Sequence, residues 1–349
     1  MQKKKEVFYS MKSYFKRRKF RGICFLALFL SFVLIPTLPV VLKKDVSKDF
    51  SSVSGLETRD KNQKCFRIFD ESTGKILRVS DKDFLYAVVS CEMPANFENE
   101  ALKAQAVASY TYFSRLREKA ENSENSQYDF KVNSEKSVNY TTENQLKQKW
   151  GKDFNKHYSK IKNAVNNVFG KVIKDDESKL ILAAYHAISS GKTEKCCDVF
   201  GGDLKYLTDV ESPGDRVSKG YQTIKEFRAE DFKSALKDNI KSEFDFENSP
   251  NDWIASTSRT DSGMVKEIEI GHIKITGIEI RKIFGLRSSN FSIEYNSERN
   301  SFIFTVLGYG HGVGMSQCGA QYMAKQGKKY NEILSWYYPG TNIEVFDSK

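Results

Sequence analysis

The alternation of hydrophobic and polar positions along the chain predicts a mixture of helices and strands. Apolar side chains occupy more than one side of residues 101–116, a pattern typical of a buried helix whose alanines allow close packing. Pro94 prevents that helix from beginning earlier, and Asn96 or Asn99 is its expected cap. Alternating β-branched and aromatic residues predict strands in three segments, 66–79 (with a turn at 72–74), 264–280 and 291–306.

Shorter patterns predict the remaining elements. Residues 81–89 form a short helix or strand, and residues 172–173 and 180–185 form the two strands of a hairpin. Helical spacing marks four further segments, 157–169, 221–249, 317–326 and 330–337. Because strands and helices follow one another without βαβ regularity, we expect an α+β fold with mainly antiparallel strands around a central cleft.

The N-terminal region predicts a membrane anchor. Residues 1–21 hold nine Lys or Arg and one acid, which is eight of the ten net positive charges of the chain, and we expect this basic head in the cytoplasm. Residues 22–42 carry no charge and are long enough to span a bilayer, although a cleaved signal peptide is the alternative. Residues 43–62 are the expected tether, and residues 63–349 are the expected extracytoplasmic domain with a polar surface insertion at 118–156.

Composition limits the class of protein. The chain is 40% hydrophobic and 13% aromatic, which is ample for a packed core. With the basic head set aside, the body is nearly neutral, and this argues against nucleic-acid binding. Of six cysteines, one lies in the predicted anchor and the others form no regular framework, so we expect thiols rather than disulfides.

Three motifs carry a family resemblance. Glu92-Met93-Pro94 precedes the helix segment Glu-Ala-Leu-Lys-Ala-Gln-Ala-Val-Ala at 100–108. Tyr185-His186 and the hydroxyl-rich residues 189–194 follow, and Gly-His-Gly-Val-Gly-Met-Ser-Gln at 310–317 with Gly-Ala at 319–320 completes the set. In this order, over about residues 65 to 342, they resemble the stage II sporulation protein D family, which includes amidase enhancers.

The resemblance implies an activity and a catalytic residue. The family cleaves peptidoglycan as lytic transglycosylases, and its essential glutamate aligns with Glu92. As an acid Glu92 would protonate the glycosidic oxygen that leaves N-acetylmuramic acid, and as a base it would accept the proton of the C6 hydroxyl that closes a 1,6-anhydro ring. From sequence alone, a glutamate before a helix is more often a solvated cap. We expect a raised pKa for this acid, a shift that Lys103 would oppose if it lay close.

The same resemblance implies substrate and partners. The substrate is glycan strands already stripped of stem peptides by a partner amidase, stage II sporulation protein P. Stage II sporulation protein M is the implied membrane partner. The implied location is the mother-cell membrane at the septum, with the body outside the cytoplasm, during engulfment.

Candidate substrate-binding residues come from the motifs and from nearby aromatic side chains. They are Lys103, Gln105, Tyr110, His186, Ser189, Ser190, Lys192, Thr193, Tyr206, His311 and Gln317. Glycine at every second position around His311 lets another group approach the backbone closely. A buried salt bridge is the alternative for Lys103, and a core aromatic is the alternative for Tyr206.

Departures from the family pattern affect the helix and two cysteines. Ser109-Tyr110 stands where the family usually has an arginine, so Tyr110 would have to take over that contact. Cys91 replaces a usual glycine, and Cys318 replaces a usual tyrosine.

Other site types are disfavoured. Gly191-Lys192-Thr193 lacks the earlier glycine of a phosphate-binding loop, because His186 occupies that position. His186 with Cys196 and Cys197 offers too few well-spaced ligands for zinc, so we expect no metal and no cofactor.

Two alternative functions remain open. The chain could bind glycan without cleaving it and stimulate an amidase, or it could be a cysteine hydrolase that uses Cys91 or Cys318 with His186 or His311.

Overall fold

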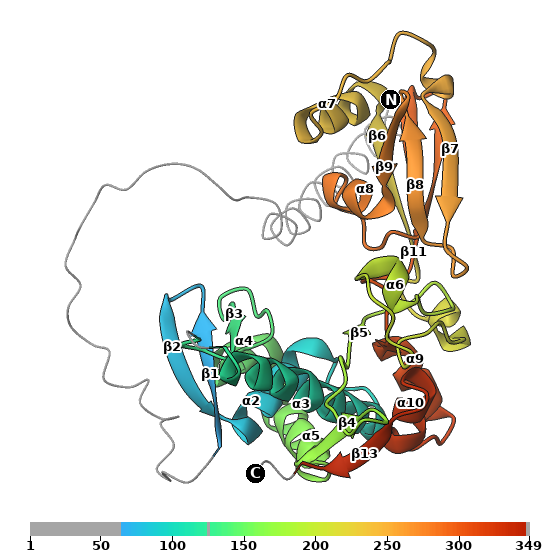
Figure 1. The fold of residues 1–349 in the computed structure, drawn as a ribbon. Coiled ribbons are helices and arrows are strands. Elements are labelled where there is room, and N and C mark those ends of the chain that lie inside the picture. The colour runs from blue at the N-terminus through green and yellow to red at the C-terminus, as the bar shows by residue number, and fades with distance from the viewer. Residues whose placement is uncertain (1–63, 124–125, 347–349) are drawn as a thin grey trace, which may run out of the picture. The chain divides into compact units, whose positions relative to one another are not determined.

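The computed structural model describes residues 64–123 and 126–346 (Figure 1). The predicted basic head, anchor and tether lie outside the described residues. Among the helices of the described part, none has the length and apolar character needed to cross a membrane. The fold is α+β with mostly antiparallel pairing, as the sequence pattern predicted.

The first hydrophobic core begins with a small sheet. Strands β1 (Cys65–Asp70) and β2 (Lys75–Ser80) form the predicted antiparallel hairpin, and Asp70 accepts hydrogen bonds from Ser72 and Thr73 in its turn. Strand β3 (Phe130–Val132) adds to β1 in parallel. The sheet therefore joins a strand that precedes α3 in the chain to one that follows it.

Helices α2 (Asp81–Glu92), α3 (Asn99–Glu121) and α5 (Phe154–Asn166) pack against one another (Figure 1). The Ser80 side chain caps α2 by accepting from the Asp83 N–H. Helix α2 ends at Glu92 because the next residue but one is a proline, which disfavours helical geometry before it. Residue Glu92 therefore lies on the last turn of a helix, rather than in a loop before one.

The start of α3 differs from the prediction. Neither Asn96 nor Asn99 is the cap; Glu98 takes that position without a capping side chain. The Glu98 N–H instead donates to Oε1 of Gln321 at 2.6 Å. The unsatisfied amide at the helix start is thus paired with a distant helix, a partner that local sequence does not reveal.

Helix α3 is almost entirely buried, as predicted. Its Arg117 forms an ion pair with buried Asp81 at 2.8 Å, and Tyr110 donates to the same carboxylate at 3.0 Å. Tyr110 is 5% exposed and stacks on Phe169, so it belongs to the core. The substrate contact expected of Tyr110 stays a prediction.

The polar segment 118–156 is more ordered than its composition indicated. It completes α3, forms β3, and then forms α4 (Glu143–Trp150) and the 3₁₀ turn η2 (Gly151–Asp153). Thr142 and Gln145 form a capping box at the start of α4. A few apolar side chains attach this segment to the core, with Phe130 and Tyr140 both buried.

The predicted hairpin at 172–185 forms only next to its turn, where Lys174 bridges Leu180 and the Ile181 N–H donates to the Ile173 carbonyl at 3.2 Å. Strand β4 (Lys171–Lys174) pairs with β13 (Asn342–Val345), near the other end of the chain. Strand β5 (Tyr185–His186) pairs in parallel with β12 (Met315–Ser316). Only Leu180 forms a bridge to β4, because the residues after it turn away from that strand and are buried in the core.

Residues 222–307 form a second hydrophobic core. One antiparallel sheet contains β10 (Phe291–Asn296), β11 (Ser301–Leu307) and β6 (Gln222–Arg228), and another contains β7 (Ile254–Arg259), β8 (Val265–Ile270) and β9 (Ile273–Thr276). Helices α7 (Ala229–Asn239) and α8 (Gly277–Ile283) accompany them. The strands at 264–276 and 291–306 confirm the prediction, whereas the helix predicted from residue 221 begins only after β6.

The chain enters and leaves the second core at one place, since the Gly308 N–H donates to the Tyr221 carbonyl at 2.7 Å. The remaining helices belong to the first core and its connecting loops, except for η4, which lies within the second core. They are α6 (Cys196–Val199), η3 (Pro213–Val217), η4 (Pro250–Asp252), α9 (Gln317–Lys325) and α10 (Tyr330–Tyr337). Helix α9 has the predicted Ser316 cap, and α10 has the predicted bounds.

Candidate functional site

A pocket of about 470 Å³ opens at the end of α2. It is lined by Cys91, Glu92, Met93, Pro94, Ala95 and Asn96 from the α2–α3 turn, and by Lys149, Trp150 and His157 from α4 and α5. Within the described part of the chain, Glu92 is the only carboxylate that lines it. Any proton transfer to a ligand in this pocket by a carboxyl group therefore falls to Glu92.

Two glutamines hold the Glu92 side chain. Gln317 Nε2 lies 3.4 Å from Glu92 Oε2 and 3.2 Å from Gln105 Oε1. Gln105, in turn, donates to Ser109 Oγ at 3.0 Å and is fully buried. A continuous amide chain from α3 through the start of α9 thus orients the carboxyl group, and it brings together three of the sequence-predicted residues.

The environment of Glu92 favours its protonated form. Burial raises the pKa of its carboxyl group, and the hydrogen bond from Gln317 opposes that rise only in part. An acid catalyst at neutral pH needs such a shift, since an ordinary glutamate is ionised there.

Tyr185 is a site residue that the predicted set did not include. Burial and then the negative charge of Glu92 raise the pKa of its hydroxyl group well above the usual range. Tyr185 therefore stays protonated beside the acid. Its position on β5 follows from the pairing with β12, which sets Tyr185 opposite Met315, two residues before Gln317.

Lys103 does not pair with Glu92. Its ammonium lies 2.7 Å from Glu100, whose other oxygen accepts from the Tyr330 N–H at 2.9 Å. The salt-bridge alternative is therefore confirmed, with α10 as the element it helps to attach.

Most of the hydroxyl-rich segment serves the fold. Ser189 Oγ donates to Asp215 Oδ2 at 2.5 Å, and Ser316 Oγ donates to Asp215 Oδ1 at 2.7 Å. Asp215 is fully buried, and burial raises its pKa against these hydrogen bonds. Asp215 thus connects the hydroxyl-rich segment to the glycine-rich motif.

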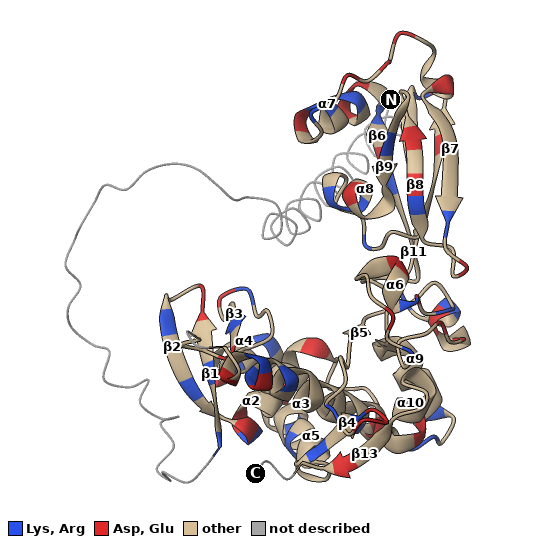
Figure 2. Cartoon of the chain, in the orientation of Figure 1, with Lys and Arg blue, Asp and Glu red and all other residues tan. Residues whose placement is uncertain are grey.

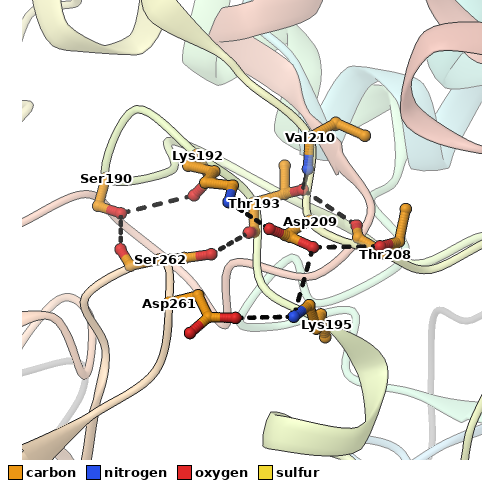
Figure 3. Close-up of polar contacts among 9 residues, drawn as sticks. All are labelled: Ser190, Lys192, Thr193, Lys195, Thr208, Asp209, Val210, Asp261 and Ser262. Atoms are coloured by element: carbon orange, nitrogen blue, oxygen red, sulfur yellow. Dashed lines mark hydrogen bonds and ion pairs between the residues drawn. The ribbon is translucent and has the colours of Figure 1, made fainter.

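Figure 3 shows how the next residues contact the second core. Lys192 pairs with Asp209, and Lys195 pairs with Asp261 at 2.8 Å. Ser190 donates to the Ser262 carbonyl at 2.9 Å, and Ser262 donates to the Thr193 carbonyl at 2.6 Å.

These contacts occupy side chains that were predicted to face a ligand. Thr193 is fully buried, with its hydroxyl group bonded to the backbone of Thr208 and Val210. Ser189, Ser190 and Thr193 therefore form hydrogen bonds that connect neighbouring loops. Tyr206 is likewise a core residue, 8% exposed, whose hydroxyl group accepts from the Leu182 N–H.

His186 and His311 form a neutral pair, with ring centroids 5.7 Å apart. Burial and then the neighbouring imidazole lower the pKa of His186 to about 3, and burial and then Arg281 lower that of His311 to about 4. His186 Nδ1 lies 3.1 Å from the Val313 carbonyl and must donate to it, so its Nε2 is an acceptor. In the described residues this buried Nε2 has no partner.

The glycine-rich motif packs against the protein itself. Gly310 and Gly312 have positive φ, and an added Cβ would come within 2.8 Å of His186 Cβ and of Glu194 Cγ respectively. The close approach that the glycine pattern predicted is therefore to β5 and the 189–194 segment.

Cys91 and Cys318 are poor nucleophiles. Burial, and then the charge of Glu92, raises the pKa of Cys91 to about 12, and burial also raises that of Cys318. Among the described residues, no group of three or more His, Cys, Asp or Glu side chains has the arrangement of a metal site. These observations disfavour the cysteine-hydrolase alternative.

Comparison with known proteins agrees with this arrangement. A family model described as stage II sporulation protein matches residues 70–174. The chain is 33% identical to stage II sporulation protein D of Bacillus amyloliquefaciens over 80% of this chain and 79% of that protein. It is 29% identical to stage II sporulation protein D of Bacillus subtilis (90% and 93% covered), and 26% identical to an amidase enhancer of the same species (75% and 40% covered).

These matches first place the chain among the stage II sporulation proteins. Its identity to relatives over most of both lengths goes further: the chain belongs to the stage II sporulation protein D family. The family acts in sporulation, and the amidase-enhancer relative supports a role at the cell wall.

Proposed function

We propose that the chain is a peptidoglycan lytic transglycosylase with Glu92 as its general acid and base. It cleaves the bond between N-acetylmuramic acid and N-acetylglucosamine in glycan strands that carry no stem peptides. The observation that carries this proposal is a single carboxyl group, with a raised pKa, in a pocket large enough for a sugar unit.

One carboxyl group suffices for this reaction. Glu92 gives its proton to the glycosidic oxygen as the bond to C1 of the muramic acid breaks. The C6 hydroxyl of the same sugar then forms a bond to C1, and its proton passes to Glu92, which regenerates the acid. Gln317 steadies the carboxylate in between through the hydrogen bond already present.

A hydrolytic alternative would need a second carboxylate, about 5–9.5 Å from the first, to act as nucleophile or to activate water. Three acids of segment 196–218 have other partners: Asp209 pairs with Lys192, Asp198 pairs with Lys266, and Asp215 binds two serines. This favours internal attack by the substrate over attack by water.

We further propose the setting that the family resemblance implies. Residues 22–42 anchor the chain in the mother-cell membrane at the septum, and the body acts outside the cytoplasm during engulfment. Stage II sporulation protein P supplies the stripped strands, and stage II sporulation protein M is the membrane partner.

A second candidate is a glycan-binding amidase enhancer that does not cleave. The observation that favours it is Tyr110, which stands where the family usually has an arginine and is buried in the core. This chain thus lacks whatever contact that arginine would make from the same position.

The two candidates are separated with the full chain in detergent and with peptide-free glycan strands. The transglycosylase yields anhydromuramyl products, Glu92→Gln yields none, and Glu98→Gln, on an exposed residue outside the pocket, yields as much as the unsubstituted chain. Products from Glu92→Gln, or none from any variant, would count against catalysis. The enhancer is favoured if Glu92→Gln still stimulates the amidase fully.

A further inference from the structure

The part of the Glu92 pocket that α4 and α5 contribute is cationic and aromatic. Lys149 and Trp150 end α4, and His157 follows in α5; all three line the pocket. Lys149 Nζ lies 3.3 Å from the Ser90 carbonyl, in the turn of α2 that carries Glu92. It also lies 5.9 Å from the centre of the Trp150 ring, whose neighbour is His157 at 5.6 Å.

The Lys149 ammonium is available to a ligand. Within the described residues it forms no ion pair. Lys147, two residues earlier on the same helix, instead pairs with Glu143 at 2.8 Å. An ammonium has three N–H donors, and the contact with Ser90 uses one. It also lies near enough to Cys91 for its charge to counteract part of the rise in the pKa of that thiol.

The wider surface has the same sign. Residues 143–162 contain six lysines and two acids, and Figure 2 colours the Lys and Arg positions of the ribbon blue. Lys160 of α5 donates to the Phe97 carbonyl at 2.5 Å, so this basic surface reaches the turn that follows Glu92. A ligand that enters the pocket from this side meets positive charge before it meets the acid.

We propose that Lys149, beside Trp150, binds the free lactyl carboxylate of the N-acetylmuramic acid unit next to the scissile bond. This inference rests on the proposed function and deepens it by naming a specificity residue. In a peptide-free strand each muramic acid carries one carboxylate, on the lactyl group at O3, and the strand is otherwise uncharged. When a stem peptide is attached, that carboxylate becomes a neutral amide, and Lys149 loses its charged partner.

The aromatic ring completes the subsite. Trp150 is half-buried beside the ammonium, and a pyranose ring can pack its apolar face on an indole while the carboxylate at O3 meets Lys149.

The test measures binding without turnover. The full chain carrying Glu92→Gln is titrated with peptide-free glycan strands and with the same strands after their lactyl carboxylates have been converted to methylamides. Lys149→Met, Lys149→Arg and Lys147→Met are each added to that background. Lys147→Met is the matched control, because it removes a neighbouring lysine that lies outside the pocket.

We expect Lys149→Met to weaken binding of the carboxylate strands about tenfold, as loss of one charge-assisted hydrogen bond would, and to leave binding of the methylamide strands unchanged. Lys149→Arg restores most of the affinity, and Lys147→Met changes little. Equal losses on both ligands, no loss on either, or an equal loss from Lys147→Met would overturn the proposal. Cleavage is judged separately, from the products of the chain that retains Glu92, so the two claims can fail independently.

Discussion

Replacing Glu92 with glutamine should make the protein more stable at neutral pH. Glutamine keeps the shape of the side chain and an oxygen for Gln317, but it cannot ionise. Because burial raises the pKa of Glu92 in the folded protein, the folded state binds the proton more tightly than the unfolded chain does. Ionisation at neutral pH therefore weakens folding, and the substitution removes that cost.

The sign and pH range follow from the direction of the shift. The cost is absent below the ordinary glutamate pKa of about 4.3 and is complete above the folded pKa. Each factor of ten by which a folded protein holds such a proton more tightly than the unfolded chain corresponds to about 1.4 kcal/mol. For a domain of this size that amounts to about 2–4 °C in melting temperature.

Urea unfolding of both proteins between about pH 4 and pH 8 measures the difference. The matched control is Glu100→Gln, which should behave oppositely. Burial raises the pKa of Glu100, but the Lys103 ammonium and the Tyr330 N–H outweigh it and hold that pKa below its usual range. Glu100→Gln should thus destabilise at neutral pH, with an effect that disappears on acidification. A Glu92→Gln protein that is less stable at neutral pH, or whose advantage grows as the pH falls, would refute the reasoning.

Three further predictions test the surroundings of the site. Gln317→Leu leaves the buried Gln105 oxygen unpaired and should cost about 1–3 kcal/mol in urea unfolding. It should also shift the alkaline limb of any cleavage profile to higher pH, because the hydrogen bond that lowers the pKa of Glu92 is lost, and an unshifted profile would contradict the role of Gln317. Arg117→Met leaves Asp81 buried without its ion pair and should cost about 3–5 kcal/mol, part of which Asp81→Asn should recover in the double variant; no recovery would argue against the pair. Gly314→Ala should destabilise the protein far more than Gly327→Ala, because the new Cβ at 314 would collide with the Ala184 carbonyl. Gly327 has open space around it, so its substitution has only the left-handed backbone cost of about 1–2 kcal/mol. Equal thermal shifts would contradict this packing.

Elements fixed by local chemistry could be predicted from the sequence. The 72–74 turn, the Ser316 cap and the helix Tyr330–Tyr337 all depend on residues within a few positions of one another. Strand pairing between distant parts of the chain could not be predicted, as when β4 pairs with β13 near the C-terminus. Strand β6 was missed since its alternation places polar and half-buried residues in turn, with Phe227 as its only aromatic side chain.

The candidate site was predicted in part for similar reasons. Glu92, Gln105 and Gln317 carry motif signals and do meet in the structure. Lys149 lies in a polar segment with no motif, so only the fold brings it to the pocket. The sequence also could not distinguish a hydroxyl group that faces a ligand from one, such as that of Ser189, that binds a buried aspartate.

The role of Glu92 is tested most directly by running the cleavage of peptide-free strands in water enriched in oxygen-18. The account predicts muramic acid ends that are one water lighter than hydrolysis products and contain no oxygen-18, and it predicts that Glu92→Gln forms none of them. Reducing ends labelled with oxygen-18, or anhydro ends formed equally by Glu92→Gln, would contradict it.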